Sequence, residues 1–360
     1  SYPKYKEIEI GVSEVLYSLE EIQGGIDMGK CDDVAVSVFC LAYNHEKYIR
    51  KTLEGFVSQK TSFKYEVVVH DDASTDNTRE IIQEYIRKYP DLIKAIFQKE
   101  NQYSKGINFI DGVIYPALHG RYIAVCEGDD YWNDADKLQK QYDALEAHPE
   151  CSLSTHKVQC CNEDGSYNGN VIPESKYNIK GTGILEGKEL FLCYWIRGHY
   201  PFQTSSYFYR KDIISANFDD PRDIGILRKA LIKGAVYYFD EPMSTRRLMS
   251  EGSWSSRLKE KGKQGDFEFT LGDIEADEKY DRYTEFKYHN YIEAGSLIKL
   301  LDFADFKITE VRKQILDKNL SPWRVVGMVP VKRFFKILLK YILLVNWPDA
   351  YLKVKKGKIL

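Results

Sequence analysis

An α/β fold with a mostly parallel central sheet, flanked by helices, is predicted by short apolar runs that alternate with helical patterns. Three runs carry this prediction: VAVSVFCLA at 34–42, the valines within YEVVVHDD at 65–72, and YIAVC at 122–126. Each run is short enough for a buried strand, and polar residues follow each run at once. Because ligands bind at the carboxyl ends of the strands in such sheets, we expect a nucleotide-type site there.

The third run is followed by the acidic sequence EGDD. Glu127, Asp129 and Asp130 place three carboxylates within four residues, and such groups repel one another unless a cation or a ligand hydroxyl lies among them. Gly128 allows a sharp turn and a close approach to a ligand. A solvated acidic turn is the simpler explanation for an isolated EGDD. A second acidic pair, Asp71 and Asp72, follows the middle run and makes a ligand-binding site the better explanation.

The segments between the strands predict the surrounding elements. Apolar spacing predicts helices over 46–59, 79–88 and 136–148, and 93–97 reads as a further strand. Tyr43 and Asn44 fall in the loop after the first strand, where a nucleotide base would lie. Asn44 is also a suitable helix N-cap, and both roles remain open.

Composition excludes some classes of protein. A net charge of −3 over 360 residues gives no global basic field for nucleic acid. The seven cysteines are odd in number and form no CxxC pair, which predicts reduced thiols and a cytosolic protein. The first residues do not read as a signal peptide, and no apolar run reaches the roughly 18–20 residues that span a bilayer.

The order of three motifs resembles the family-2 glycosyltransferases. They are VSVFCLAYNHEKYIRKTLEGFVSQ, EVVVHDDASTDNT and YIAVCEGDDYW. That family comprises inverting enzymes with the GT-A fold that use nucleotide-sugar donors. The resemblance, to the bacterial surface-polysaccharide type, is strong over about 34–150 and looser to about 256. It implies a catalytic domain at 34–256 behind an N-terminal extension at 1–33.

The resemblance also implies roles for residues of the donor site. Asp72 falls where the family hydrogen-bonds the pyrimidine N3–H, which implies a UDP-linked donor, and Asp71 is expected only to cap backbone amides. Lys105 lies in a loop that can approach the diphosphate, although a solvated lysine is an equally good explanation. The implied nucleotide-sugar-binding residues are Ala42, Tyr43, Asn44, Asp71, Asp72, Lys105, Asp129 and Arg247.

Glu127, Asp129 and Asp130 occupy the family's metal-binding position, with Glu as a mild departure in the first slot. The resemblance implies Mg²⁺ or Mn²⁺ there, because hard divalent cations prefer oxygen ligands. Tyr131 and Trp132 are expected either to wall the sugar pocket or to pack the turn.

Asp220, just before Pro221, falls at the family's catalytic-base position, with Asp219 and Asp223 as competitors. The segment 204–206 is expected near the junction of donor and acceptor. Arg247 falls where relatives carry an arginine that faces the diphosphate. Relatives often have a histidine two residues later, where this chain has Met249.

The last hundred residues differ in character. The polar segment 262–281 is expected to be a boundary or a mobile loop, within a largely helical region at 257–330. Residues 331–360 carry eight basic side chains and one acidic one, interleaved with large apolar residues. Such a pattern predicts binding to an anionic membrane surface, at the inner face of the cell membrane. A terminal helix docked on its own protein or on a partner subunit is the alternative.

The predicted reaction is transfer of a sugar, a hexose or an N-acetylhexosamine, to a glycan or lipid-linked glycan acceptor. The sequence leaves two alternatives. A sugar-nucleotide pyrophosphorylase needs a Gly-rich basic loop after the first strand, where this chain has AYNHEKYI. A non-catalytic nucleotide-sugar-binding module is indicated only by Met249.

Overall fold

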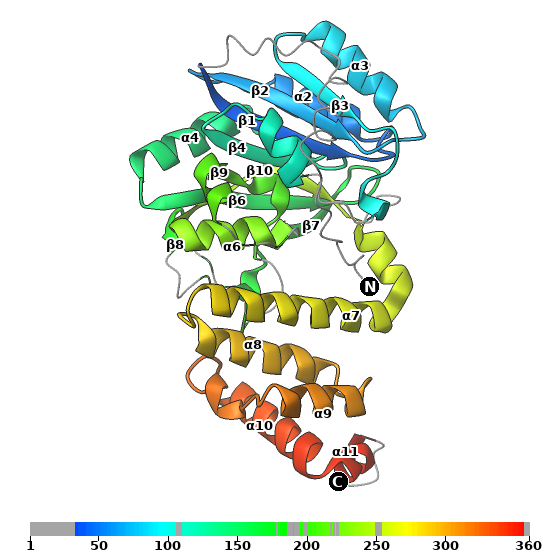
Figure 1. The fold of residues 1–360 in the computed structure, drawn as a ribbon, viewed down its shortest axis with the longest axis vertical. Coiled ribbons are helices and arrows are strands. Elements are labelled where there is room, and N and C mark those ends of the chain that lie inside the picture. The colour runs from blue at the N-terminus through cyan, green and yellow to red at the C-terminus, as the bar shows by residue number, and fades with distance from the viewer. Residues whose placement is uncertain are drawn as a thin grey trace. The chain divides into compact units, whose positions relative to one another are not determined.

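The protein consists of two compact units, shown in Figure 1. The structure, a computed structural model, describes residues 33–105, 110–177, 179, 181–185, 190, 195–196, 201–216, 218, 220, 223–248 and 254–355. One unit extends to residue 186 and includes 202–257, and the other comprises 187–201 and 258–360. The N-terminal extension predicted at 1–33 lies outside the described residues, apart from Asp33.

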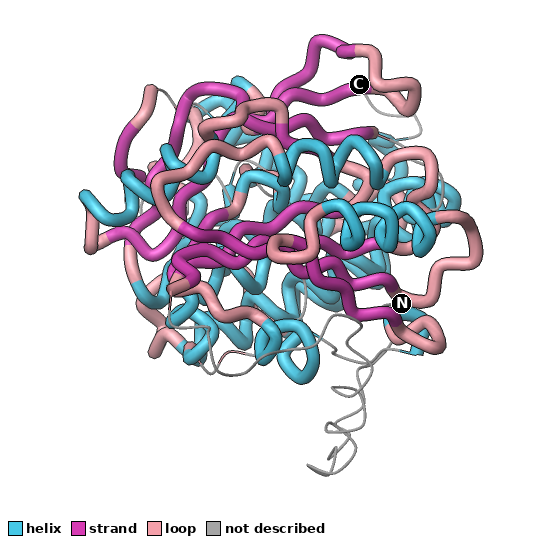
Figure 2. The backbone as a smooth tube through the Cα atoms, turned by 90° about the horizontal axis from the view of Figure 1, so that it is seen from above, coloured by secondary structure: helices cyan, strands magenta, loops and turns pink. Residues whose placement is uncertain are grey.

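The first unit is built on a sheet whose strand order is β3-β2-β1-β4-β9-β6-β10-β5. The first four strands are mutually parallel, β9 runs antiparallel to both β4 and β6, and β10 is parallel to β6. Figure 2 shows these strands running together through the unit. The strands are β1 (Val34–Ala42), β2 (Lys64–Asp71), β3 (Ile93–Phe97), β4 (Tyr122–Glu127), β5 (Tyr131–Trp132), β6 (Cys151–Cys161), β7 (Tyr167–Ile172), β8 (Gly183–Leu185), β9 (Phe208–Arg210) and β10 (Ala235–Arg247).

Helices cover the sheet because alternate residues of each buried strand point to opposite faces. On one face, α2 (Ile49–Val57), α3 (Thr78–Lys88) and α4 (Lys137–Ala147) share a core with β1, β2 and β4. On the other face Phe39 packs edge-on against Tyr115, with ring centroids 6.4 Å apart. Helix α6 (Asp223–Lys233) contacts β6 and β10. The predicted α/β class and the strands at 34–42 and 93–97 are confirmed.

The second unit is helical. It contains most of α7 (Trp254–Tyr283), then α8 (His289–Asp302), α9 (Ile308–Asp317), α10 (Val331–Asn346) and α11 (Pro348–Lys355). The expected loop at 262–281 is therefore wrong, because this segment lies within α7, which has a kink at Gly262.

The physical reason is a buried ion cluster between α7 and α8. Asp273 and Asp277, one helical turn apart, both pair with Lys299, and the Asp277 oxygen lies 2.9 Å from the Lys299 Nζ. All three side chains are buried. Burial lowers the pKa of Lys299, but the charges of Asp273 and Asp277 outweigh it and hold the pKa above its usual value. Acidic residues that resemble a solvated loop in the sequence thus form part of the core.

The described cysteines are buried and form no disulfide, as predicted; they are Cys40, Cys126, Cys151, Cys160 and Cys161. Within the described residues, none of the helices combines the length and the apolar character needed to cross a bilayer.

Candidate active site

The carboxyl ends of β1, β2 and β4 meet at one edge of the sheet. Ala42 is in register with Asp71, and Leu41 is in register with Glu127. Two hydrogen bonds continue the pairing beyond the strands: Asp72 N donates to Ala42 O at 2.9 Å, and Gly128 N donates to Leu41 O at 2.8 Å. The predicted convergence of the polar strand ends is confirmed.

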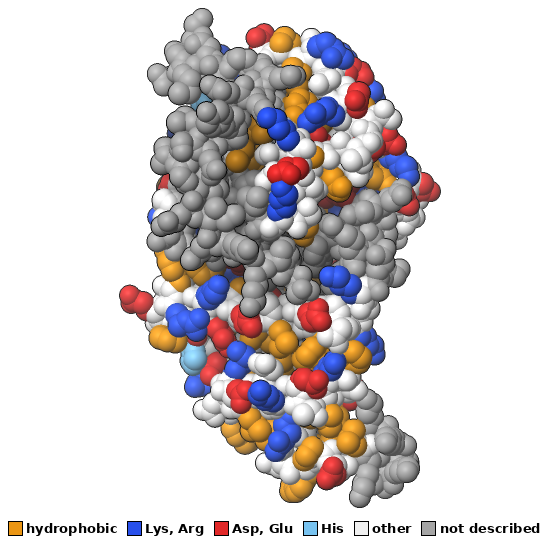
Figure 3. Space-filling model, turned by 45° about the vertical axis from the view of Figure 1, so that its right-hand side comes forward, with side chains coloured by type: hydrophobic (Ala, Val, Ile, Leu, Met, Phe, Trp, Pro, Cys, Tyr) orange, Lys and Arg blue, Asp and Glu red, His pale blue; other side chains and the backbone are white. Residues whose placement is uncertain are grey.

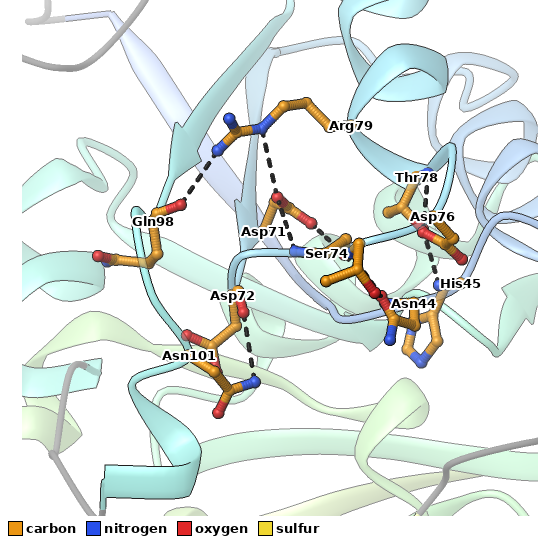
Figure 4. A network of polar contacts seen from close by, with 11 residues as sticks. Asn44, His45, Asp71, Asp72, Ser74, Asp76, Thr78, Arg79, Gln98 and Asn101 are labelled. Atoms are coloured by element: carbon orange, nitrogen blue, oxygen red, sulfur yellow. Dashed lines mark hydrogen bonds and ion pairs between the residues drawn. The ribbon is translucent and has the colours of Figure 1, made fainter.

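A network of hydrogen bonds joins the loop after β1 to the loop after β2 (Figure 4). Asn44 has a φ of 55°, its backbone N donates to Ser74 Oγ at 2.9 Å, and its Oδ1 accepts from Thr75 N at 2.8 Å. His45 N donates to Thr78 Oγ1 at 2.7 Å. The N-cap of α2 is Tyr48, so Asn44 holds the neighbouring loop instead of capping a helix. These hydrogen bonds hold the two loops in fixed positions next to each other.

Asp71 and Asp72 are both buried, and the carboxylate of each accepts hydrogen bonds from other residues of the protein. Asp71 accepts a hydrogen bond from Ser74 Oγ and lies 3.6 Å from the Arg79 Nε. Asp72 accepts from two backbone amides, Gln102 N at 2.7 Å and Tyr103 N at 3.1 Å. Burial raises the pKa of both carboxyls, although these hydrogen bonds oppose the shift. A carboxylate has about four lone-pair sites, so Asp72 retains acceptor capacity beyond these two amides.

The other predicted donor-site residues around these loops differ in exposure. Ala42 is buried, whereas Tyr43 is exposed. Lys105, in a short 3-10 turn, is exposed and forms an ion pair with Glu100. The residues that follow, 106–109, lie outside the described part of the chain. The predicted roles of these residues at a nucleotide stay predictions.

The acidic turn after β4 packs tightly against α2. A Cβ added at Gly128 would lie 2.7 Å from the His45 Nδ1 and 3.0 Å from the Ile49 Cδ1, so glycine is the residue that fits. Thr52 Oγ1 lies 3.0 Å from the Gly128 carbonyl oxygen and 2.6 Å from that of Asp130. The position of the turn is therefore set by helix α2 as well as by β4.

The carboxylates of this turn have different environments. Glu127 and Asp129 are partly exposed, whereas Asp130 is buried. Asp130 Oδ1 accepts from Arg247 N at 2.9 Å, and its Oδ2 accepts from Gln203 Nε2 at 3.3 Å. Burial, together with the charge of Asp129, raises the pKa of Asp130 to about 7. Asp130 thus ties the turn to β10 and to Gln203.

The donor chemistry of the turn fits a hard divalent cation in part. Within the described residues, no three His, Cys, Asp or Glu side chains are grouped as a complete metal cage. Mg²⁺, however, is commonly held by one or two carboxylates while substrate phosphates and waters complete its shell. Glu127 and Asp129 supply two carboxylates of that kind, and Asp130 supports them from behind.

A cavity in the sheet unit connects the acidic turn with the segment that precedes α6. Glu127 from the end of β4 and Asp220 line the same cavity, and Lys229 lies on its wall, 4.0 Å from Asp111. Thr204 also lines it, whereas Ser205 and Ser206 are buried in hydrogen bonds to Ser244 and Thr155. The remaining lining residues are Phe39, Leu41, Ile110, Tyr115, Val125, Cys126, Gly225 and Ile226.

Asp220 forms a buried ion pair with Arg228 of α6. A guanidinium at this position stabilises the ionised carboxylate, which is the form that a general base requires. Asp219 lies outside the described residues, and Asp223 is the first residue of α6. Of the described aspartates Asp220 and Asp223, only Asp220 lines the cavity, and its role as the base stays a prediction.

Arg247 is the last residue of β10 and is largely buried. Its guanidinium lies over the Tyr48 ring at 4.8 Å, and Nη1 donates to the Glu163 carbonyl oxygen at 2.7 Å. Its backbone amide is the group that holds Asp130. Its role towards a diphosphate stays a prediction, and Met249 lies outside the described residues.

Trp132 packs the turn, which was one of its two predicted roles. Its ring is buried against Phe56 with centroids 4.7 Å apart, and Nε1 donates to Ser205 O at 3.0 Å. Tyr131 is partly exposed and lies under Lys51, whose Nζ is 3.8 Å from the ring centroid.

Comparison with known proteins identifies the family of this domain. Residues 37–199 match the sequence profile described as Glycosyl transferase family 2. The matched segment, 37–199, is therefore a glycosyltransferase family 2 domain. Its fold is similar to that of Staphylococcus aureus TarS 1–349, solved with UDP (TM-score 0.53, 17% identity, 90% of this chain and 92% of that one) and with UDP-GlcNAc (TM-score 0.51, 19% identity, 90% and 93%).

Two sequence relatives extend the comparison. An uncharacterized Mycobacterium tuberculosis protein is 35% identical over 232 residues, which are 63% of each chain. A Bacillus subtilis protein, TuaG, whose name proposes a teichuronic acid biosynthesis glycosyltransferase, is 31% identical over 131 residues, 36% of this chain and 49% of its own. The match to the first relative thus spans less than two thirds of that protein's length.

Three residues that the sequence does not mark support the site. Gln203 and Thr52 fix the acidic turn, and Arg228 pairs with Asp220. Gln203 directly precedes the segment expected near the reacting groups, which was the only signal for it. Thr52 and Arg228 lie within helical patterns and gave none.

Proposed function

We propose that the protein is an inverting glycosyltransferase that moves a sugar from a UDP-linked donor to an acceptor hydroxyl in surface-polysaccharide synthesis. One observation carries the proposal: a single cavity joins Glu127 of the acidic turn to Asp220. Transfer needs charge stabilisation for a leaving diphosphate and a carboxylate for the attacking hydroxyl. Both kinds of group line this cavity.

Three further observations support the substrate class. The TarS structures of similar fold were solved with UDP and with UDP-GlcNAc. Asp72 lies at the strand edge with acceptor capacity to spare, as a group that reads the uracil N3–H requires. TuaG, the Bacillus subtilis relative, is named for teichuronic acid synthesis, which favours a surface glycan as the acceptor.

The proposed reaction is a single displacement. The acceptor oxygen forms a bond to the anomeric carbon while the bond from that carbon to the UDP oxygen breaks. A carboxylate takes the acceptor's proton, and UDP leaves with the bonding electron pair. Attack from the side opposite the leaving group inverts the configuration.

Asp129 and Glu127 are the proposed ligands of Mg²⁺ or Mn²⁺, and Asp130 holds the turn that presents them. When bound, the cation offsets the charge that develops on the diphosphate. Asp72 orients the base, and Lys105 and Arg247 are the candidate cationic groups towards the phosphates.

Asp220 is the proposed general base because it lines the cavity. We expect Asp220→Asn to lower turnover by about 10² to 10⁴-fold, the usual range for loss of a general base, with donor affinity nearly unchanged. Turnover and UDP-sugar affinity are to be measured for Asp219→Asn and Asp223→Asn in parallel. If Asp223→Asn gives the large loss and Asp220→Asn does not, the base is at the start of α6 and Asp220 only pairs with Arg228.

A donor screen tests the proposed function as a whole. A bound donor stabilises the fold by mass action, so thermal shifts with nucleotide sugars, with and without Mn²⁺, should identify a preferred donor. Slow metal-dependent release of UDP from that donor is then expected. Donor binding without any UDP release, also with candidate glycan acceptors present, would instead indicate a non-catalytic binding module.

A further inference from the structure

Helix α10 has two apolar faces, although a helix on the surface of a globular unit needs only one. Ile337 and Leu344 are buried. Val331, Phe335 and Leu339 are spaced four residues apart and are 71%, 61% and 60% exposed. At about 100° per residue, this exposed stripe lies roughly half a turn away from the buried pair. The packing of the helical unit therefore does not explain the second face.

Aromatic rings extend the exposed stripe beyond α10. Trp323 is 65% exposed, and its ring centroid lies 5.9 Å from that of Phe334. Phe334 in turn contacts Phe335, with centroids 5.7 Å apart. We call the set Trp323, Val331, Phe334, Phe335 and Leu339 the α10 patch. It is a continuous apolar surface with a tryptophan at one end.

Two basic side chains of α10, Lys332 and Lys336, lie beside the α10 patch, and Arg333 lies farther round the helix. Lys332, Arg333 and Lys336 are exposed and form no ion pair with residues that the structure describes. The sequence of α10, VKRFFKILLKYILLVN, contains no acidic residue. Figure 3 shows hydrophobic, basic and acidic side chains interleaved on the C-terminal helices. The patch thus presents an apolar surface and positive charge together.

This combination distinguishes between possible occupants. The chain's own core already packs on the opposite face of α10, at Ile337 and Leu344. A second copy in a two-fold interface would bring the same three cations together, and like charges without counterions disfavour such contact. Anionic lipid headgroups supply negative charge beside an apolar layer, which matches both features.

We propose that the α10 patch docks on the surface of an anionic lipid bilayer. Trp323, Phe335 and Leu339 enter the headgroup boundary, and Lys332 and Lys336 contact the phosphate groups, as in interfacial amphipathic helices. Arg333 adds electrostatic attraction from farther round the helix. Attachment is peripheral and reversible. This refines the expectation for 331–360, because part of that segment belongs to the core of the helical unit.

Substitutions at exposed positions test the proposal, since deletion of 331–360 would remove the buried Ile337 and Leu344. The full chain is to be sedimented with liposomes of phosphatidylcholine alone and with added phosphatidylglycerol. Binding is expected only to the anionic liposomes, and it should weaken with salt because the charges are screened. Lys332→Gln/Arg333→Gln/Lys336→Gln should lower partitioning on the order of 100-fold at low salt. Phe335→Ser/Leu339→Ser should abolish the binding that persists at higher salt.

A matched variant controls for net charge. Lys261→Gln/Lys263→Gln/Lys279→Gln removes three exposed charges from α7 and should bind like the wild type; an equal loss would show non-specific attraction and contradict the proposal. All variants must keep the wild-type melting temperature and release UDP from a soluble donor as the wild type does. Absence of binding to anionic liposomes at low salt would overturn the proposal. So would a dimer, seen by analytical ultracentrifugation, that Phe335→Ser/Leu339→Ser dissociates while liposome binding is unaffected.

Discussion

At the scale of single residues, the buried carboxylate of Asp72 has two roles in our proposal. It holds the backbone amides of Gln102 and Tyr103, and we propose that it also reads the uracil N3–H. Cytosine presents an acceptor at that position, so a carboxylate that reads the base should favour UDP over CDP.

We expect Asp72→Asn to weaken UDP binding by about 10- to 100-fold, the range for a hydrogen bond to a charged group, and to narrow the preference for UDP over CDP. Isothermal titration with both nucleotides measures this. An equal loss for UDP and CDP would mean that Asp72 acts only through the loop at 101–103, and that the base is read elsewhere.

Lys137 makes stability depend on pH. Its side chain is buried, its Nζ donates to Gln141 Oε1 at 2.6 Å, and burial lowers its pKa to about 7. Between pH 7 and the unfolded value of about 10.4, the unfolded chain binds a proton that the folded chain does not. The contribution of Lys137 to the free energy of unfolding therefore rises with pH over that window.

Lys137→Met should remove this dependence. From pH 7 to pH 9 the wild type is expected to gain on the order of 2 kcal/mol of unfolding free energy relative to the variant. Urea unfolding of both proteins at the two pH values measures the difference. Parallel pH profiles would show that Lys137 stays protonated in the folded protein.

At the scale of elements, the cluster that joins α7 to α8 explains why a polar segment is helical. Removing one partner of a buried ion pair leaves an uncompensated charge, which typically costs about 3–5 kcal/mol. We expect Lys299→Met to destabilise the protein by that amount, because Asp273 and Asp277 would both lose their cation.

The same change in an Asp273→Asn/Asp277→Asn background should cost much less, since neutral amides do not require a cation. Thermal unfolding of the four proteins in this cycle gives the coupling. A cost below about 0.5 kcal/mol for Lys299→Met alone, as for ordinary surface changes, would contradict the packing of α7 on α8.

Elements with regularly spaced apolar residues were predictable from the sequence. Elements that are held by buried polar residues were not. The strands predicted at 34–42 and 93–97 match the structure because runs of valine and isoleucine favour buried strands. The helix expected at 46–59 is shorter, Ile49–Val57, because residues 44–46 hydrogen-bond to the loop after β2. The α7 error arose because the pairing of Asp273 and Asp277 with Lys299 joins residues more than twenty positions apart.

At the scale of the whole molecule, the sequence located the strand ends that form the site but not the bonds within it. The acidic turn was found because three carboxylates follow a buried strand. That Asp130 faces inward, held by Arg247 and Gln203, depends on contacts between β4, β10 and the 3-10 turn at 204–206. Such distant contacts leave no local pattern in the chain.

We propose that the acidic turn after β4 is the active site of a metal-dependent sugar transfer. The measurement is the release of UDP from the preferred donor, with acceptor and Mn²⁺, by the wild type, Asp129→Asn and Asp136→Asn. Asp136 is an exposed aspartate seven residues away, so both variants lose one negative charge. We predict that EDTA abolishes the wild-type rate, that Asp129→Asn lowers it at least about 100-fold, as for loss of a key electrostatic group, and that Asp136→Asn leaves it unchanged. Undiminished UDP release by Asp129→Asn, or by the wild type in EDTA, would contradict the account.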